Sequence, residues 1–170
     1  MPTAYLGLGS NIGERMNFIR NALSKIEKIR DTSLIKSSSV YETEPWGVSG
    51  QDNYLNCAVE IETKLAAEDL LRELKNIEIK LGRQENKKWS EREIDIDLLF
   101  YGNEIISKEN MKVPHLQIEN RKFVLIPLSE IAPQLIHPVF RKNMTELLKE
   151  TKDELKVVKY EKDKTENLHL

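Results

Sequence analysis

The chain has 170 residues, of which 32% are charged and 39% hydrophobic, and its formal net charge at pH 7 is -2. This length suits a single domain with a sizeable core, and the balanced charge excludes a protein that binds polyanions over its whole surface. Because the N-terminus lacks a basic segment before a long apolar run, and no stretch approaches the roughly 20 apolar residues that span a bilayer, we expect a soluble cytoplasmic protein.

The first predicted strand covers residues 3–8 and leads through a Gly/Ser/Asn turn into a helix. We expect Ser10 or Asn11 to cap this helix, because their side chains accept hydrogen bonds from free backbone N–H groups. The sequence GLGSNIG favours such a turn over a phosphate-binding loop, since it lacks the G-x-G-x-x-G spacing and has no lysine after Gly13. The apolar residues of the helix recur at helical spacing: Met16, Ile19, Leu23 and Ile26.

Two strands are expected next, at residues 34–43 and 54–62, and their succession suggests antiparallel pairing. In the second strand Leu55, Cys57, Val59 and Ile61 alternate toward one face. The single cysteine therefore fits a buried structural thiol better than a nucleophile.

A second helix has its apolar stripe between residues 70 and 81 and is followed by Gly82, where a helix C-terminal glycine is expected. A further strand follows at residues 94–101. The order strand, helix, strand, strand, helix, strand predicts an α/β (α+β) fold with a ferredoxin-like βαββαβ core, in which helices pack on a mainly antiparallel sheet.

The rest of the chain is less regular. Three prolines interrupt the apolar stretch at 111–133, which favours a short helix between them, and LKVVKY at 155–160 could add an edge strand. We expect residues 1–160 to form one domain and residues 161–170 to be a flexible charged tail.

Two carboxylates in the strand at 94–101 point to chemistry. Because side chains alternate, Asp95 and Asp97 share a face with Leu99 and Tyr101, opposite Ile94, Ile96, Leu98 and Phe100. Two such charges repel by about 2 kcal/mol at an effective dielectric constant near 20. Either water or one or two Mg²⁺ ions could offset this repulsion.

A basic loop precedes these acids. It contains Arg83, Lys87, Lys88 and Arg92, and phosphoryl transfer needs such cations beside metal ligands. A solvated charged loop is the simpler interpretation, although Trp89 argues against it, because an indole usually packs on another group. His115 and Arg121 could reach the same phosphates.

A second group of residues suits a planar heterocycle. Asn56 and Tyr54 share one strand face, and an amide offers a donor and an acceptor side by side. Trp46, Tyr54 and Phe123 could stack on such a ring, or they could be ordinary core aromatics.

Several motifs together resemble one enzyme family. LGSNIG, VYETEPWG, YLNCAVEIET, REIDIDLLFYG, VPH and NRKFVLIPLSEIAP occur in order between residues 3 and 138. They resemble 6-hydroxymethyl-7,8-dihydropterin pyrophosphokinase of folate biosynthesis. This resemblance implies a ferredoxin-like enzyme that moves the diphosphate of ATP onto the hydroxymethyl group of the pterin, releases AMP and uses two Mg²⁺ ions. We expect the enzyme to be a monomer.

The resemblance also assigns site residues. It implies that Asp95 and Asp97 bind metal and are catalytic together with Arg83 and Arg92. The implied pterin-binding residues are Thr43, Pro45, Trp46, Tyr54, Asn56 and Phe123. The implied ATP-binding residues are Glu78, Arg83, Lys88, Trp89, Arg92, Leu98, His115 and Arg121.

Some positions depart from the family pattern. Ser90 and Glu91 replace a common Gly-Pro pair. Lys88 stands where arginine is common, and a lysine cannot donate the two parallel hydrogen bonds that an arginine guanidinium gives to a phosphate. Lys75 and Lys112 replace other polar residues and are left out of the expected site.

Two other functions compete. A ferredoxin-like RNA-binding module would stack bases on the sheet, but the acidic pair and an isoelectric point near 6.0 disfavour it, so no nucleic acid partner is expected. A catalytically inactive scaffold is disfavoured because the expected ligands are all present.

Overall fold

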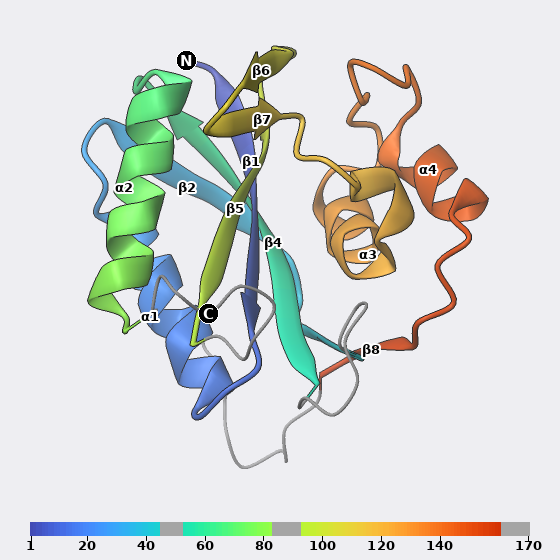
Figure 1. Cartoon of the computed structure of the whole chain (residues 1–170), viewed down its shortest axis with the longest axis horizontal. Helices are drawn as coiled ribbons and strands as arrows, with labels where there is room; N and C mark the ends of the chain where they lie inside the picture. The colour runs from blue at the N-terminus through green and yellow to red at the C-terminus, as the bar shows by residue number, and fades with distance from the viewer. Residues whose placement is uncertain (45–52, 83–92, 161–170) are drawn as a thin grey trace.

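The computed structural model describes residues 1–44, 53–82 and 93–160. Its main element is a six-stranded sheet in which every pairing is antiparallel (Figure 1). The strand order is β5-β1-β4-β3-β8, with β2 also paired to β4. The bounds of these strands are β1 Thr3–Ser10, β2 Thr32–Ser37, β3 Tyr41–Thr43, β4 Tyr54–Thr63, β5 Asp95–Tyr101 and β8 Val157–Lys159.

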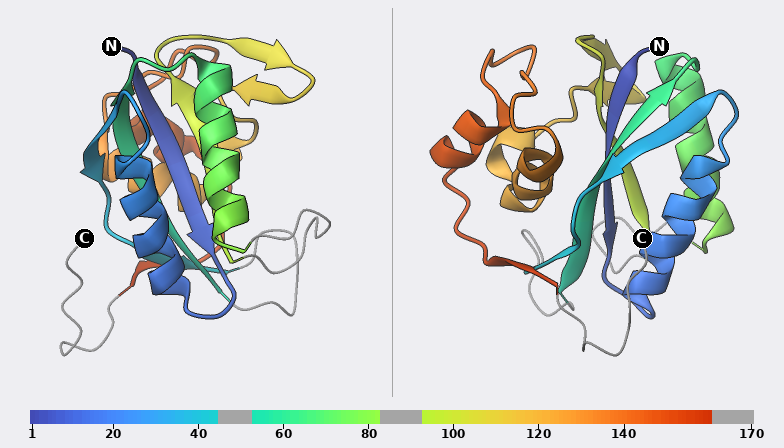
Figure 2. Two further views of the ribbon diagram at one scale, coloured as in Figure 1. Left: turned by 90° about the vertical axis from the view of Figure 1, so that its left-hand side faces the viewer. Right: turned by 180° about the vertical axis from the view of Figure 1, so that it is seen from behind.

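Helices cover both faces of the sheet. Figures 1 and 2 show α1 and α2 on one face and α3 and α4 on the other, which gives three layers. The helices are α1 Arg15–Glu27, α2 Ala67–Lys80, α3 Lys122–Ile131 and α4 Met144–Glu150, with a short 3-10 turn at Ile118–Asn120. A small hairpin follows β5 and consists of β6 Ile106–Lys108 and β7 Met111–Val113. Among the described residues, none of the helices is long and apolar enough to cross a membrane.

The ferredoxin-like prediction is confirmed. Strands β1, β4 and β5 are the first, third and fourth strands of the ferredoxin-like core, and β2 and β3 together take the place of the second. β1 and β4 are neighbours at the centre of the sheet. The strand expected at 34–43 is divided into β2 and β3, which both pair with β4. The helix expected in the stretch with three prolines is α3, but Pro127 lies inside this helix rather than at its border. The expected edge strand is β8.

The helix cap predicted for α1 is wrong. Ser10 is the last residue of β1, and the N-cap residue is Glu14, whose side chain makes no capping hydrogen bond. The expected turn does occur, and Gly13 adopts a φ of 64° there, a left-handed conformation that favours glycine.

The side chain of Cys57 is buried on the sheet face that α1 and α2 cover, as the alternation predicts. Burial raises the pKa of its thiol to about 12, because a thiolate would lose its hydration there. Cys57 is therefore protonated at neutral pH and acts as a small apolar core residue.

A bulge in β5 changes which face its last residues occupy. Tyr5 pairs with Phe100, but its neighbour Leu6 pairs with Leu98, so Leu99 is an extra residue. Phe100 consequently packs in the α3 and α4 layer, and Tyr101 lies in the α1 and α2 layer. The predicted faces are correct up to Leu99 and wrong for these two aromatic residues.

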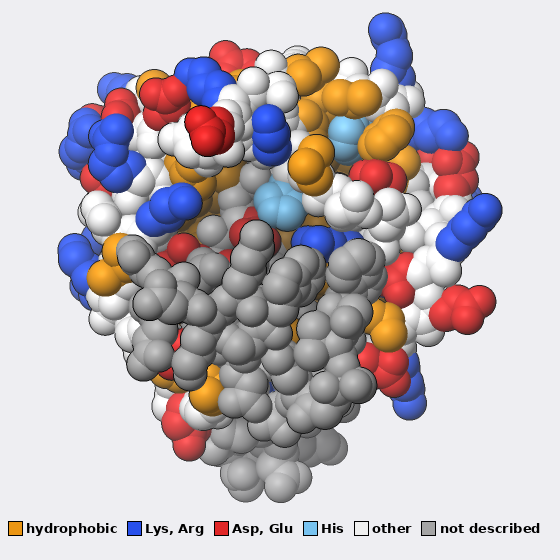
Figure 3. Space-filling model, in the orientation of Figure 1, with side chains coloured by type: hydrophobic (Ala, Val, Ile, Leu, Met, Phe, Trp, Pro, Cys, Tyr) orange, Lys and Arg blue, Asp and Glu red, His pale blue; other side chains and the backbone are white. Residues whose placement is uncertain are grey.

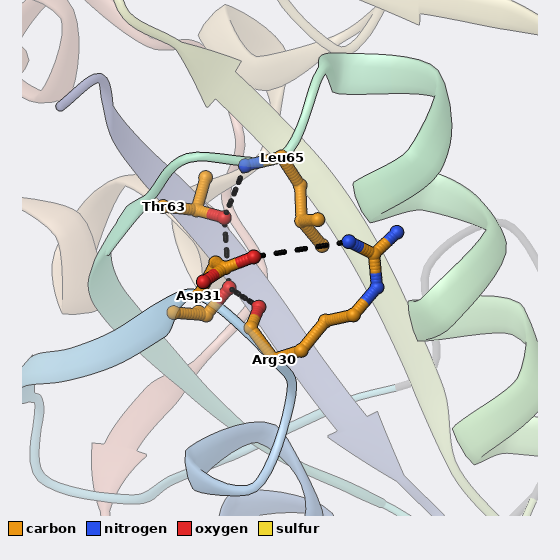
Figure 4. A network of polar contacts seen from close by, with 5 residues as sticks. Arg30, Asp31, Thr63 and Leu65 are labelled. Atoms are coloured by element: carbon orange, nitrogen blue, oxygen red, sulfur yellow. Dashed lines mark hydrogen bonds and ion pairs between the residues drawn. The ribbon is translucent and has the colours of Figure 1, made fainter.

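A polar network fixes the end of the sheet far from the acidic pair (Figure 4). The Thr32 and Thr63 hydroxyls are 2.7 Å apart, and the Thr63 hydroxyl also accepts the Leu65 N–H at 3.1 Å. The Thr32 hydroxyl donates to the Arg30 carbonyl, and the Arg30 guanidinium lies 3.8 Å from the Asp31 carboxylate. These contacts join β2, β4 and the start of α2 into one unit.

Candidate active site

A row of residues crosses three strands at the centre of the candidate site. Asp95 of β5 is opposite Gly9 of β1, and Gly9 is opposite Asn56 of β4. In the next row Asp97 is opposite Gly7. Directly opposite residues point to the same face, so the acids and the amide of Asn56 face the α3 side of the sheet, with only glycine between them.

The glycines of β1 are needed for this arrangement. A Cβ atom on Gly9 would lie 2.8 Å from the Asn56 side-chain oxygen, which is closer than real Cβ atoms approach. A Cβ atom on Gly7 would lie 3.3 Å from a Leu99 methyl group. The glycines of the motif GLGSN therefore form a flat strand surface between Asp95 and Asn56. The sequence prediction assigned this motif only to a turn and did not include this role.

A cavity of about 450 Å³ runs along β5, the edge strand, between α2 and β7. All described residues that the family resemblance assigns to ATP line this cavity. They are Glu78, Leu98, His115 and Arg121, and the two acids assigned to the metal, Asp95 and Asp97, line it as well. The cavity therefore brings together residues from α2, β5 and the segment before α3.

Two contacts fix the geometry around the acids. The buried Glu78 carboxylate accepts the N–H of Ile96 at 2.8 Å, and Ile96 lies between Asp95 and Asp97. The N–H of His115 donates to the Leu99 carbonyl at 2.9 Å, and its Nε2 lies 3.8 Å from Asp97 Oδ2. The strand that carries the acids is thus held from α2 and from the chain after β7.

The His115 ring has a defined orientation. Its Nδ1 lies 2.8 Å from the carbonyl oxygen of Leu116, a hydrogen-bond acceptor, and its Nε2 is directed at Asp97. Figure 3 shows a histidine beside acidic and basic side chains in a hollow near the middle of the visible face.

A second, narrower cavity of about 30 Å³ lies over the α3 face of the sheet. Asn56, Phe123 and both aspartates line it, so Asp95 and Asp97 border the two cavities. Within the site, Asn56 Nδ2 donates to Thr43 Oγ1 at 2.6 Å, which fixes the orientation of the amide.

Arg121 connects the two cavities. It lines the larger one, and its guanidinium carbon lies 5.8 Å from the centroid of the Phe123 ring, which lines the smaller one. Tyr54 lies at the start of β4 near Gly9, where its ring would be 3.6 Å from an added Cβ atom. Every described residue of the expected site thus lies on or beside these two cavities.

Six expected residues lie outside the described part of the chain, so their positions stay predictions. They are Pro45, Trp46, Arg83, Lys88, Trp89 and Arg92.

Sequence reasoning left out two lysines that line the larger cavity, Lys75 and Lys112. The helical spacing contained a signal for the first, because Lys75 lies three residues before Glu78 and so on the same face of α2. Lys112 is on β7, three residues before His115, and its ammonium group donates to the Ser107 hydroxyl at 3.2 Å.

Asp95 and Asp97 are the described residues best suited to hold a metal ion. No group of three or more His, Cys, Asp or Glu that could hold one occurs within residues 1–44, 53–82 and 93–160. Two half-buried carboxylates on one strand face suit a hard cation that takes its remaining ligands from water and substrate phosphates, as Mg²⁺ commonly does.

Comparison with known proteins shows to which family the chain belongs. Residues 5–133 match the family 7,8-dihydro-6-hydroxymethylpterin-pyrophosphokinase (HPPK). The chain belongs to the HPPK family. The HPPK match covers the strands, helices and cavities described above, apart from the C-terminal part with α4 and β8.

Individual HPPK relatives are similar over nearly their whole length. A 2-amino-4-hydroxy-6-hydroxymethyldihydropteridine pyrophosphokinase of Aquifex aeolicus is 44% identical, covering 86% of this chain and 90% of the relative. The enzyme of the same name from Haemophilus influenzae is 42% identical, covering 90% and 95% respectively. The chain is therefore a pyrophosphokinase.

Solved structures agree on the fold. The wild-type HPPK-DHPS protein of Plasmodium falciparum with pteroate superposes with a TM-score of 0.72 at 15% sequence identity. The match covers 87% of this chain but only 42% of that longer protein. The sheet face that an RNA-binding module would use is covered by α3 and α4, so the structure and the family both argue against that alternative.

Proposed function

We propose that this pyrophosphokinase binds ATP in the larger cavity and 6-hydroxymethyl-7,8-dihydropterin in the smaller one. The diphosphate of ATP then moves to the hydroxymethyl group, and AMP is released. One observation carries the placement of the substrates: Asp95 and Asp97 border both cavities, so groups bound in the two would meet at the acids.

Asp95 and Asp97 would hold Mg²⁺, and two ions are proposed. Bound Mg²⁺ would neutralise negative charge on the transferring phosphates. The Glu78 carboxylate accepts the N–H of Ile96, the residue between the two acids, and so holds this part of β5. The acids therefore need little rearrangement when the nucleotide binds.

The basic side chains among the described residues would bind the nucleotide. Arg121 and His115 line the larger cavity, and we assign them to the phosphate groups together with Arg83, Lys88 and Arg92, which lie outside the described residues. Lys75 lies in the same lining and adds one more positive charge.

The pterin would bind through Asn56. The hydrogen bond to Thr43 uses one N–H of the amide and leaves its second N–H and its oxygen for the edge of a heterocycle. A cavity of about 30 Å³ is too small for a bicyclic ring, so Phe123 would have to move aside and then stack on the pterin. Tyr54 would border the ring.

The transfer step is a displacement at phosphorus. The hydroxymethyl oxygen bonds to the β-phosphorus while the bond from that phosphorus to the oxygen shared with the α-phosphorus breaks, and AMP leaves with that oxygen. The hydroxymethyl proton must also be lost, and the Asp97 carboxylate or a metal-bound oxygen would accept it. We propose a monomeric enzyme, which the molar mass in solution from light scattering tests.

The test is to incubate the purified protein with ATP and Mg²⁺, with and without the pterin, and to quantify AMP, ADP and the pterin diphosphate. We expect AMP and pterin diphosphate in equal amounts, and only when the pterin is present. AMP formation that does not depend on the pterin, formation of ADP, or no turnover by folded protein that binds ATP would contradict the proposal. The last result would favour the inactive scaffold.

A further inference from the structure

Arg15 joins three segments that are distant in the sequence. Its Nη1 lies 3.2 Å from the Glu42 carboxylate of β3 and donates to the Asn53 carbonyl at 2.8 Å, directly before β4. The guanidinium carbon also lies 5.9 Å from the centroid of the Tyr160 ring, directly after β8. One side chain on α1 therefore contacts β3, the residue directly before β4 and the residue directly after β8.

The position of Arg15 is unfavourable for the helix that carries it. It is the first residue of α1, and a cation there meets the positive end of the helix dipole. The first turn of α1 contains no acidic residue; the N-cap residue Glu14 directly precedes it, and Arg15 pairs with Glu42 of β3. The ion pair with Glu42 is partly buried, with side-chain exposures of 25% and 29%, so the Arg15 guanidinium is directed at β3 rather than at solvent.

The residues that Arg15 contacts are direct neighbours of the proposed pterin site. Glu42 precedes Thr43, Asn53 precedes Tyr54, and Thr43 pairs with Tyr54 in the ladder between β3 and β4. The hydrogen bond from Asn56 to Thr43 spans the same pair of strands. A shift of β3 relative to β4 would therefore change the orientation of the Asn56 amide.

Arg15 acts on this pair from the face opposite the pterin. Side chains alternate along β3, so Glu42 points away from the face that carries Tyr41 and Thr43. On that other face the Glu130 carboxylate of α3 accepts the Tyr41 hydroxyl and the Ser39 N–H, both at 2.6 Å. The short strand β3 is thus held from both sides of the sheet.

The C-terminal strand completes the arrangement. β8 pairs with all three residues of β3, and the N–H of Tyr160 donates to the Val40 carbonyl at 2.8 Å. Tyr160 is partly buried against the α1 and α2 side of the core, where its ring faces the Arg15 guanidinium. Arg15 thereby also links β8 to the start of α1.

We propose that Arg15 is a positioning residue for the pterin: by contacting Glu42 and Asn53 it fixes the register of β3 and β4 that orients Thr43 and Asn56. This inference rests on the proposed function, because it assumes that the pterin binds at Asn56. It predicts an effect that is selective for one substrate, since the ATP cavity is lined from α2, β5 and β7 and includes none of the residues Arg15 contacts.

The test is the Arg15→Met variant, which keeps the aliphatic length but loses the charge and the donors. We expect the KM for the pterin and its directly measured Kd to rise about five- to tenfold, equivalent to about 1 kcal/mol or slightly more. The KM for ATP and kcat should change less than about twofold. Arg30→Met is the matched control, because Arg30 forms an exposed ion pair at the other end of the sheet, and we expect it to match the wild type.

Equal rises in both KM values, or an unchanged Kd for the pterin, would overturn the proposal. Should Arg15→Met not fold, Glu42→Gln and Tyr160→Leu test the same contacts from the other side, and both should weaken pterin binding selectively. Wild-type protein that neither binds the pterin nor forms AMP would instead refute the proposed function. The two failures are therefore distinguishable.

Discussion

Replacing Asp97 with asparagine is expected to lower kcat at least about a hundredfold. This is the scale of losing one electrostatic stabiliser of a transition state, and Asp97 would lose both its metal-binding charge and its capacity to accept a proton. The folded state should be retained, because Asp97 is half-buried at the border of two cavities and asparagine has nearly the same shape. Steady-state kinetics of AMP release and a thermal unfolding curve measure the two effects.

Glu104→Gln is the matched control for Asp97→Asn. Glu104 is an exposed acid shortly after the same strand, outside both cavities, so its loss removes one charge without touching the site. We expect wild-type kcat for this control. An Asp97→Asn variant with kcat within about tenfold of the wild type would contradict the metal-binding role.

The second large effect is expected for Asn56→Ala. Two substrate hydrogen bonds at about 1.5 kcal/mol each correspond to a loss of roughly a hundredfold in kcat/KM for the pterin. The KM for ATP should stay within about twofold, because Asn56 lines only the smaller cavity. Kinetics with each substrate varied in turn separate the two constants.

Gly9→Ala provides an independent variant for the same claim. This variant retains the asparagine at position 56 but adds a methyl group 2.8 Å from the present position of its side-chain oxygen. The amide must therefore shift. We expect a loss of pterin affinity in the same direction and smaller than that of Asn56→Ala. If both variants raised the KM for ATP as much as that for the pterin, the assignment of Asn56 to the pterin would be wrong.

Local sequence patterns predicted much of the fold because hydrophobic spacing reflects burial. The alternation in β4 correctly placed Cys57 in the core and Asn56 on the opposite face. The same reasoning failed at Phe100 and Tyr101, because the bulge at Leu99 depends on pairing with β1, a strand about 90 residues away in the sequence. An apolar run contains no signal that one of its residues is extra.

Sequence reasoning selected candidate site residues where a residue type has a chemical reason. The acids stood out because two charges on an apolar strand are costly without a partner. The need for glycine at position 9 was missed, because it depends on the register between β1 and β4 that places Asn56 opposite Gly9. Lys75 and Lys112 were missed since a lysine on a surface helix or strand usually contacts only solvent.

The most direct test of the central claim is to measure Mn²⁺ binding, with Mn²⁺ as a spectroscopic substitute for Mg²⁺. Free Mn²⁺ would be quantified by electron paramagnetic resonance in the presence of a non-hydrolysable ATP analogue, for the wild type and for the double variant Asp95→Asn, Asp97→Asn. The account predicts that two Mn²⁺ ions bind per wild-type chain together with the analogue, and that the double variant loses at least one of them. Equal Mn²⁺ binding by both proteins would contradict the assignment of Asp95 and Asp97 as the residues that hold the metal.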